Sequence, residues 1–169
     1  MYDEANLWLN EADKFDNNEI LLASTKAEYY SLRNNLSAAS ETLETLFESG
    51  SADFQAYTAS GIVELKKGNP DHALSKLIQA TALERNYSRA YAFLAVAHLH
   101  SGEPEVAFRQ LEMAENLDPN DPLPNIIASQ IHAGLLQPEQ AVQEAEKVKL
   151  KSDTPRSIGQ LANDQQGGA

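Results

Sequence analysis

The chain has no cysteine, only one tryptophan and two methionines, and 13 basic side chains against 25 acidic ones. The absence of cysteine excludes disulfides, thiolate metal sites and cysteine nucleophiles. It fits a reducing and an oxidising compartment equally, so the cytoplasm and a bacterial cell envelope or periplasm both stay open. No apolar run approaches the roughly 18 residues of a membrane-spanning helix.

The net charge of −12 at pH 7 disfavours partners that are themselves strongly anionic. Binding a phosphate backbone needs clustered lysine and arginine, which argues against nucleic acid as a partner. The same excess of acid argues against anionic membrane surfaces. A hydrophobic content of 42% and a charged content of 22% are ordinary for a folded globular protein.

Small and large apolar residues recur in this chain with a period of 34 residues. Alanine holds one position of this register in every unit, and leucine holds a position four residues further on. Such a spacing of small and large apolar columns is typical of stacked helix-turn-helix units. The two columns are Ala5, Ala39, Ala73, Ala107 and Ala141, and Leu9, Leu43, Leu77 and Leu111.

Residues 54–87 show how one such unit is expected to fold. Apolar residues at helical spacing predict a first helix from about 53 to 67, and Gly68 ends it. Pro70 suits the first turn of a second helix, where a backbone N–H has no intrahelical partner. Proline returns one and two repeats later, at Pro104 and Pro138, so the same start is predicted three times.

Small side chains have a packing role in this prediction. Two helices of a hairpin approach closely only where their side chains are small, and Gly61 and Ala73 provide such a place. Leu77 and its equivalents are then expected to fill the space between neighbouring hairpins.

These features resemble the tetratricopeptide (TPR) repeat family. Residues 54–87 and 88–121 match the family pattern well, whereas 122–155 departs from it, with Asn125 in place of the aromatic residue and Leu136 in place of the glycine. The matching residues are Tyr57, Gly61, Gly68, Ala73, Leu77 and Ala80 in the first unit, and Tyr91, Leu94, Ala95, Gly102, Ala107, Leu111, Ala114 and Pro119 in the second.

The resemblance implies an all-α fold, a right-handed superhelical solenoid of antiparallel helix hairpins. The array is expected to begin with half a hairpin, so we expect the chain to be a fragment of a larger bacterial TPR protein. The expected divisions are a half repeat at 1–19, a degenerate repeat at 20–53, repeats at 54–87 and 88–121, a divergent repeat at 122–155, and a short capping helix or disordered tail at 156–169.

The resemblance also places the functional surface on the concave face, which the first helices of the hairpins line. Apolar residues there, with Lys66 and Arg89 at the rim, suit an amphipathic helix or an extended apolar peptide. The same side chains suit plain packing between neighbouring helices equally well. The candidate groove residues are Thr58, Ile62, Leu65, Lys66, Arg89, Ala92, Phe93, Val96, Leu99, Ile126 and Gln130.

The histidines and carboxylates predict no metal site and no catalytic site. His98 and His132 fall one repeat apart, but neighbouring helices stand about 9–10 Å apart, so a half-buried spacer role is favoured over metal binding. Acid pairs such as Glu103 and Glu105 lie at helix starts, where solvated surface is the common role. No glycine loop for nucleotides and no nucleophile elbow is present, so neither a cofactor nor catalysis is expected.

The sequence therefore predicts a non-catalytic protein–protein interaction module, a scaffold or adaptor that binds a peptide or helix in its concave groove. Two alternatives stay open at this point. The chain could be the substrate-recruiting arm of a larger multidomain enzyme, or a structural segment that associates with itself as a homodimer. The identity of the protein partner is beyond the sequence.

Overall fold

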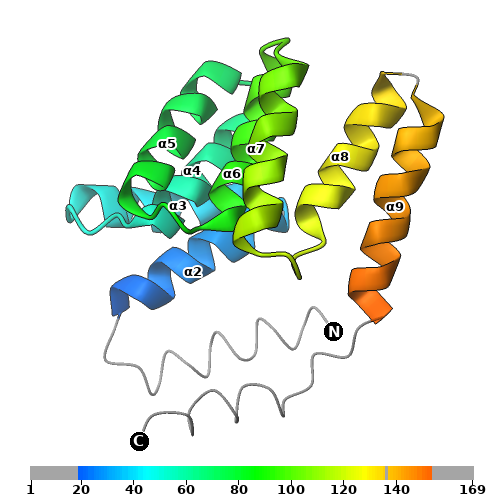
Figure 1. Ribbon diagram of the computed structural model, residues 1–169. Helices are drawn as coiled ribbons and strands as arrows, with labels where there is room; N and C mark the ends of the chain where they lie inside the picture. The colour runs from blue at the N-terminus through cyan, green and yellow to red at the C-terminus, as the bar shows by residue number, and fades with distance from the viewer. Residues whose placement is uncertain (1–18, 136, 154–169) are drawn as a thin grey trace, which may run out of the picture.

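A computed structural model describes residues 19–135 and 137–153, and all regular structure in those ranges is helical (Figure 1). The expected half repeat lies outside the described residues apart from residue 19, and the expected tail at 156–169 lies wholly outside them. None of the described helices is both long and apolar enough to cross a bilayer. The helices are α2 (Glu19–Leu32), α3 (Leu36–Glu48), α4 (Phe54–Lys66), α5 (Pro70–Leu83), α6 (Ser88–His100), α7 (Pro104–Leu117), α8 (Leu123–Gly134) and α9 (Pro138–Asp153).

The helices pack as a row of hairpins (Figure 1). Helices α2 and α3, α4 and α5, α6 and α7, and α8 and α9 each contact one another extensively, and each hairpin contacts the next along the chain. The prediction of an all-α helical repeat solenoid is confirmed for the described residues. The hydrophobic core is likewise repetitive. It consists of separate apolar clusters between neighbouring helices and has no single centre.

The turn inside the hairpins is held by the same pair of bonds in three successive repeats. The residue just before α5, α7 or α9 donates its backbone N–H to a carbonyl five residues earlier, and the side chains of the two residues also bond. These pairs are Asn69 with Glu64, Glu103 with His98, and Gln137 with His132, at side-chain distances of 2.9, 2.7 and 2.7 Å. Each of the two histidines thus bonds within its own turn.

In three hairpins, the chain reverses after the first helix through a residue with left-handed backbone conformation. Asn34, Gly68 and Gly102 share one position of the repeat and have φ angles of 62°, 80° and 79°. Glycine adopts this backbone at no steric cost, and asparagine at a small one. Pro70 and Pro104 then begin α5 and α7, as the sequence predicts.

The small residue at the hairpin crossing is required by contact with the leucine column. A Cβ placed on Gly61 would lie 2.5 Å from the Leu77 Cγ, and Leu77 is fully buried. Leu77 in turn packs with Ala73 and with Leu94 and Ala97 of α6. The predicted roles of Gly61 and Leu77, a close crossing and a filled space between hairpins, are therefore both found in the structure.

Gly61→Ala tests this crossing. Alanine gains about 0.5–1 kcal/mol over glycine inside a helix, but overpacking a buried contact costs roughly 1–3 kcal/mol. We expect a net loss of unfolding free energy on the order of 1 kcal/mol in urea denaturation. Gly134→Ala is the matched control, because nothing lies within 4 Å of a Cβ there. If both variants gain stability equally, Gly61 is not a packing residue.

Helix α2 departs from the regular stacking. It contacts α4 as extensively as it contacts its own partner α3, whereas α4 and α6, and α6 and α8, touch only slightly. Figure 1 shows α2 running obliquely to the upright α5 and α7. Small side chains on α2, Ser24, Ala27 and Ser31, are fully buried and allow this close approach.

Candidate functional site

The candidate groove residues divide into a covered set and an open set. The covered set is Thr58, Ile62 and Ala92, which are at most 1% exposed. Thr58 and Ile62 lie on α4, which contacts α2 extensively, and Ala92 of α6 belongs to a buried cluster with Ile127 of α8. A ligand therefore has no access to these three side chains in this structure.

Both cations expected at the rim already have partners within the chain. The Lys66 Nζ donates to the backbone carbonyl of Leu32, at the end of α2, over 3.2 Å. The Arg89 Nη1 lies 3.0 Å from the Glu28 Oε1. Partial burial works to lower the pKa of Arg89, but the Glu28 carboxylate outweighs it and raises that pKa. The two cations thus fasten α2 to α4 and α6.

Glu28 is the centre of a polar link that sequence reasoning missed. Its side chain is 4% exposed, and it accepts hydrogen bonds from Arg89 and from the Tyr87 hydroxyl at the start of α6. Burial of the hydroxyl, together with the carboxylate, raises the pKa of Tyr87, so this group stays a donor. The sequence signal for this link was Glu28 itself, because the next two repeats have the aliphatic residues Ile62 and Val96 at the same position.

The open set, which we call the open stripe, consists of Phe93, Val96 and Leu99 of α6 and Ile126 and Gln130 of α8. The three α6 side chains are half-buried, Ile126 is 38% exposed, and Gln130 is exposed. Helices α6 and α8 touch. Val96 and Leu99 pack in part against the buried cluster shared by α6, α7 and α8, and Phe93 packs in part against the cluster that contains Leu77. Leu65 of α4 is half-buried against the neighbouring cluster that contains Leu77.

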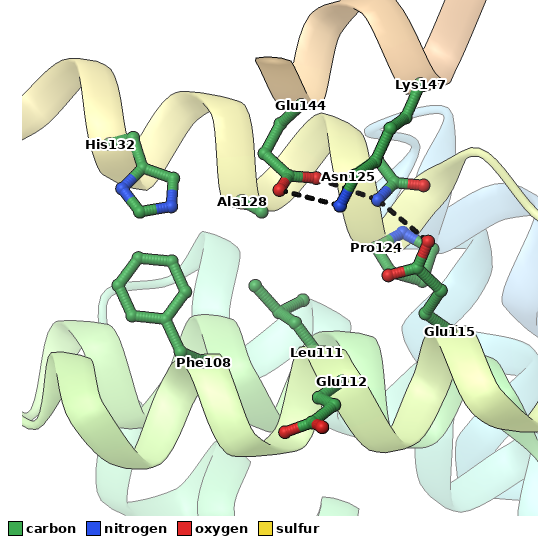
Figure 2. A pocket seen from close by; sticks show the side chains of 10 residues that line it. All are labelled: Phe108, Leu111, Glu112, Glu115, Pro124, Asn125, Ala128, His132, Glu144 and Lys147. Carbon is green, nitrogen blue, oxygen red and sulfur yellow. Dashed lines mark hydrogen bonds and ion pairs between the residues drawn. The ribbon is translucent and has the colours of Figure 1, made fainter. Parts of the chain in front are cut away.

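A second feature is a cavity of about 220 Å³ between α7, α8 and α9 (Figure 2). Its apolar wall includes the Phe108 ring, which stacks on His132 with centroids 4.5 Å apart. The residues that line it are Phe108, Leu111, Glu112, Glu115, Pro124, Asn125, Ala128, His132, Glu144 and Lys147.

A buried amide organises the polar end of this cavity. Asn125 is 1% exposed and donates to Glu144 over 2.9 Å and to Glu115 over 3.3 Å (Figure 2). Lys151 of α9 donates to the Asn125 carbonyl oxygen and, over 3.1 Å, to Glu115. Burial works to raise the pKa of Glu115, but the hydrogen bonds from Lys151 and Asn125 outweigh it, so the pKa is lowered. The network of Glu115, Asn125, Glu144 and Lys151 holds α9 against α7 and α8.

The same positions of the repeat hold an aromatic cluster two units earlier. Tyr57 of α4 meets the Phe47 ring of α3 edge-on at 5.2 Å, and the Lys76 ammonium of α5 lies over both rings. Counting by 34, these positions correspond to Asn125, Glu115 and Glu144. In the sequence, Asn125 stands out only as a departure from the family pattern. The coordinated change at all three positions was the signal for a polar junction.

Comparison with known proteins gives similarity in structure only. No family model and no curated protein matches the chain. MamA is similar at 20% identity, with 90% of this chain and 89% of that chain covered and a TM-score of 0.60. MamA from Desulfovibrio magneticus RS-1 has 19% identity, coverages of 92% and 88%, and a TM-score of 0.62.

Two further structures extend this comparison. YrrB, described as a TPR protein with an unusual peptide-binding site, has 18% identity, coverages of 97% and 84%, and a TM-score of 0.58. The APC/C Cut9–Hcn1 hetero-tetramer has 18% identity and a TM-score of 0.70, with 96% of this chain but only 32% of that chain covered. At these identities the likeness concerns the fold, and this chain has the fold of a TPR protein.

Proposed function

We propose that the chain is a non-catalytic protein-interaction module that holds a peptide or helix on its concave face. The observation that carries this proposal is the open stripe, in which three apolar side chains of α6 are half-buried and Ile126 and Gln130 of α8 are exposed. The peptide-binding site ascribed to YrrB, which has the same fold, lends support.

The chemistry of the open stripe suggests the kind of ligand. Phe93, Val96 and Leu99 recur at helical spacing along α6, so they offer a ridge that an apolar helix face or extended peptide can cover. Phe93 supplies a large rigid contact, as aromatic anchors do in interfaces. Gln130 adds one exposed amide beside Ile126 and provides a polar contact for orientation.

The buried or partly buried acids and the two histidines one repeat apart have structural partners. Glu28 is bound by Arg89 and Tyr87, and Glu115 by Lys151 and Asn125. His98 and His132 each bond within their own turn. These contacts support binding rather than chemistry as the role of the described residues.

Peptide display tests the proposal without knowledge of the natural ligand. A random peptide library is selected on the wild-type chain, and the peptides are then measured against Val96→Glu by fluorescence anisotropy. Placing a carboxylate in the stripe forces its desolvation on binding, so we expect the affinity to fall at least about tenfold. Ile78→Glu on α5 is the matched control, because Ile78 is 54% exposed and lies outside the stripe.

Two outcomes would contradict this proposal. Peptides that bind Val96→Glu as tightly as the wild type contact another surface. A fall in affinity that comes with loss of helical circular dichroism would make Val96 a core residue, which is the packing role that the sequence leaves open.

A further inference from the structure

The cavity between α7, α8 and α9 is separate from the open stripe (Figure 2). On α8 its lining includes Ala128 and His132, whereas the open stripe uses Ile126 and Gln130. Ala128 follows Ile126 by two residues, which is roughly half a turn of an α-helix. The cavity and the open stripe therefore lie on different faces of α8, and a group that enters one need not touch the other.

The cavity lies where the repeat changes its side chains. Two repeats before Asn125 stands Tyr57, whose ring meets Phe47 and lies beneath the Lys76 ammonium. That earlier junction thus contains its own rings and its own cation. At the later junction the smaller Asn125 replaces the ring, and about 220 Å³ is open beside it. Pockets for drug-sized molecules measure roughly 300–1,000 Å³, so this space suits one side chain.

Carboxylates outnumber cations in the lining of the cavity. Glu112, Glu115 and Glu144 stand against Lys147. Lys147 lies 3.0 Å from Glu144, which also accepts a hydrogen bond from Asn125. The lysine of the lining is therefore already paired, and the excess of negative charge falls on the two acids of α7.

These two acids of α7 can accept further hydrogen bonds. The bonds to Glu115 from Asn125 and Lys151 both fall on its Oε1. Within residues 19–135 and 137–153, no hydrogen bond or ion pair reaches the Glu115 Oε2 or the Glu112 carboxylate. An ionised carboxylate accepts on both oxygens, and residues three apart are neighbours on a helix. A cation that enters here is therefore received by two carboxylates.

The rest of the lining suits a cation with an alkyl chain and a flat head. Figure 2 shows the stacked Phe108 and His132 rings at one end of the cavity, Glu115 at the other end, and Leu111 between them. An alkyl chain can cover such an apolar wall while its charged end reaches the acids. A guanidinium fits better than an ammonium, because it is planar, more weakly hydrated, and donates in a fork that matches carboxylates.

We propose that this cavity receives the side chain of an arginine from a partner polypeptide. The guanidinium donates to the Glu115 Oε2 and to Glu112, and the methylenes pack against Leu111. A polypeptide is favoured over free arginine, because the α-carboxylate of the amino acid would meet the same acids while Lys147 is already paired with Glu144. The inference goes beyond the proposed function, because it adds a second site that does not depend on the open stripe.

A nuclear magnetic resonance titration with N-acetyl-arginine amide tests the inference on the full chain. The side-chain amide signal of Asn125 is the reporter, because this amide is buried and bonds Glu115 directly. We expect a shift of this signal that saturates. N-acetyl-citrulline amide has nearly the same shape but no charge, so it should bind at least about tenfold more weakly, since charge-assisted hydrogen bonds are the stronger ones.

A pair of variants then locates the binding. Glu112→Gln should weaken the binding of N-acetyl-arginine amide about threefold to tenfold, because it removes one of the two receiving charges. Glu112 is exposed and takes no part in the network around Asn125, so the fold should be kept. Glu146→Gln makes the same change of charge at an exposed position of α9 outside the cavity, and it should bind the probe like the wild type.

Several results would overturn the inference. These are no saturable shift at Asn125, equal binding of the citrulline probe, or equal effects of Glu112→Gln and Glu146→Gln. Free L-arginine or N-acetyl-lysine amide that binds as tightly as the arginine probe would also contradict it, since the source or the preference for guanidinium would then be wrong. Val96→Glu should leave the titration unchanged, because Val96 does not line the cavity. Failure of the open stripe and failure of this site are therefore measured separately.

Discussion

Leu77→Ala is expected to lower the free energy of unfolding by about 2–5 kcal/mol, the range for large-to-small changes in a packed core. Leu77 is fully buried and fills the space between the α4–α5 hairpin and α6. Its neighbours there include Gly61, Ala73 and Ala97, whose short side chains cannot extend into the space that leucine leaves. The loss should therefore lie in the upper part of that range.

Urea unfolding followed by circular dichroism at 222 nm measures this loss. Leu83→Ala, in the same helix, is the control, because Leu83 is 58% exposed and its truncation should change the stability by no more than about 0.5 kcal/mol. Equal losses for the two variants would show that the leucine column does not carry the packing between hairpins.

The repeat and its turns could be predicted from the sequence because they depend on local rules. A left-handed residue at Gly68 or Gly102 followed by proline two residues later fixes where one helix ends and the next begins. The small residue at Gly61 and the leucine at Leu77 are likewise visible as columns. These local rules give the helices and their order, and the all-α solenoid follows.

The exposure of the groove could not be predicted in the same way. Ile62 and Val96 hold the same position of the repeat, and both are aliphatic, yet Ile62 is 1% exposed and Val96 is half-buried. The two helices differ in their neighbours, because α4 contacts α2 extensively whereas α6 touches α4 and α8 only slightly. Nothing in the sequence of α4 specifies which neighbour covers it. The groove residues therefore remain a prediction that the binding experiments must test.

The polar junction at α9 was also invisible to periodicity. The repeat pattern ranks residues by size and polarity at single positions, so Asn125 counts only as a mismatch. Its meaning depends on Glu115, Glu144 and Lys151, which come from two other helices. A buried amide becomes favourable only when all its partners are present.

Lys151→Met is expected to lower the free energy of unfolding by about 1–3 kcal/mol, because it leaves partners of a largely buried network unsatisfied. The Lys151 side chain is 15% exposed, and its ammonium bonds Asn125, Glu115 and the Asp121 carbonyl. Methionine keeps most of the volume, so the change removes charge and hydrogen bonds rather than packing. Lys149→Met, at an exposed position two residues earlier, is the control and should change little. If Lys149→Met lowered the free energy of unfolding as much, the effect would come from the change in net charge and not from the network around Asn125.

The pH dependence of this stability loss shows whether it comes from the lost Lys151–Glu115 interaction or from disturbed packing at α9. The pKa of Glu115 in the folded chain lies below its ordinary value of 4.5. A carboxyl with a lowered folded pKa adds stability that is complete above the ordinary pKa and disappears as the pH falls through the folded pKa. The wild type should therefore lead Lys151→Met fully at pH 7, and the lead should shrink below about pH 4.5. A lead that stays constant down to about pH 3 would mean that the methionine disturbs packing at α9, and that the ionised Glu115 does not hold the helix in place.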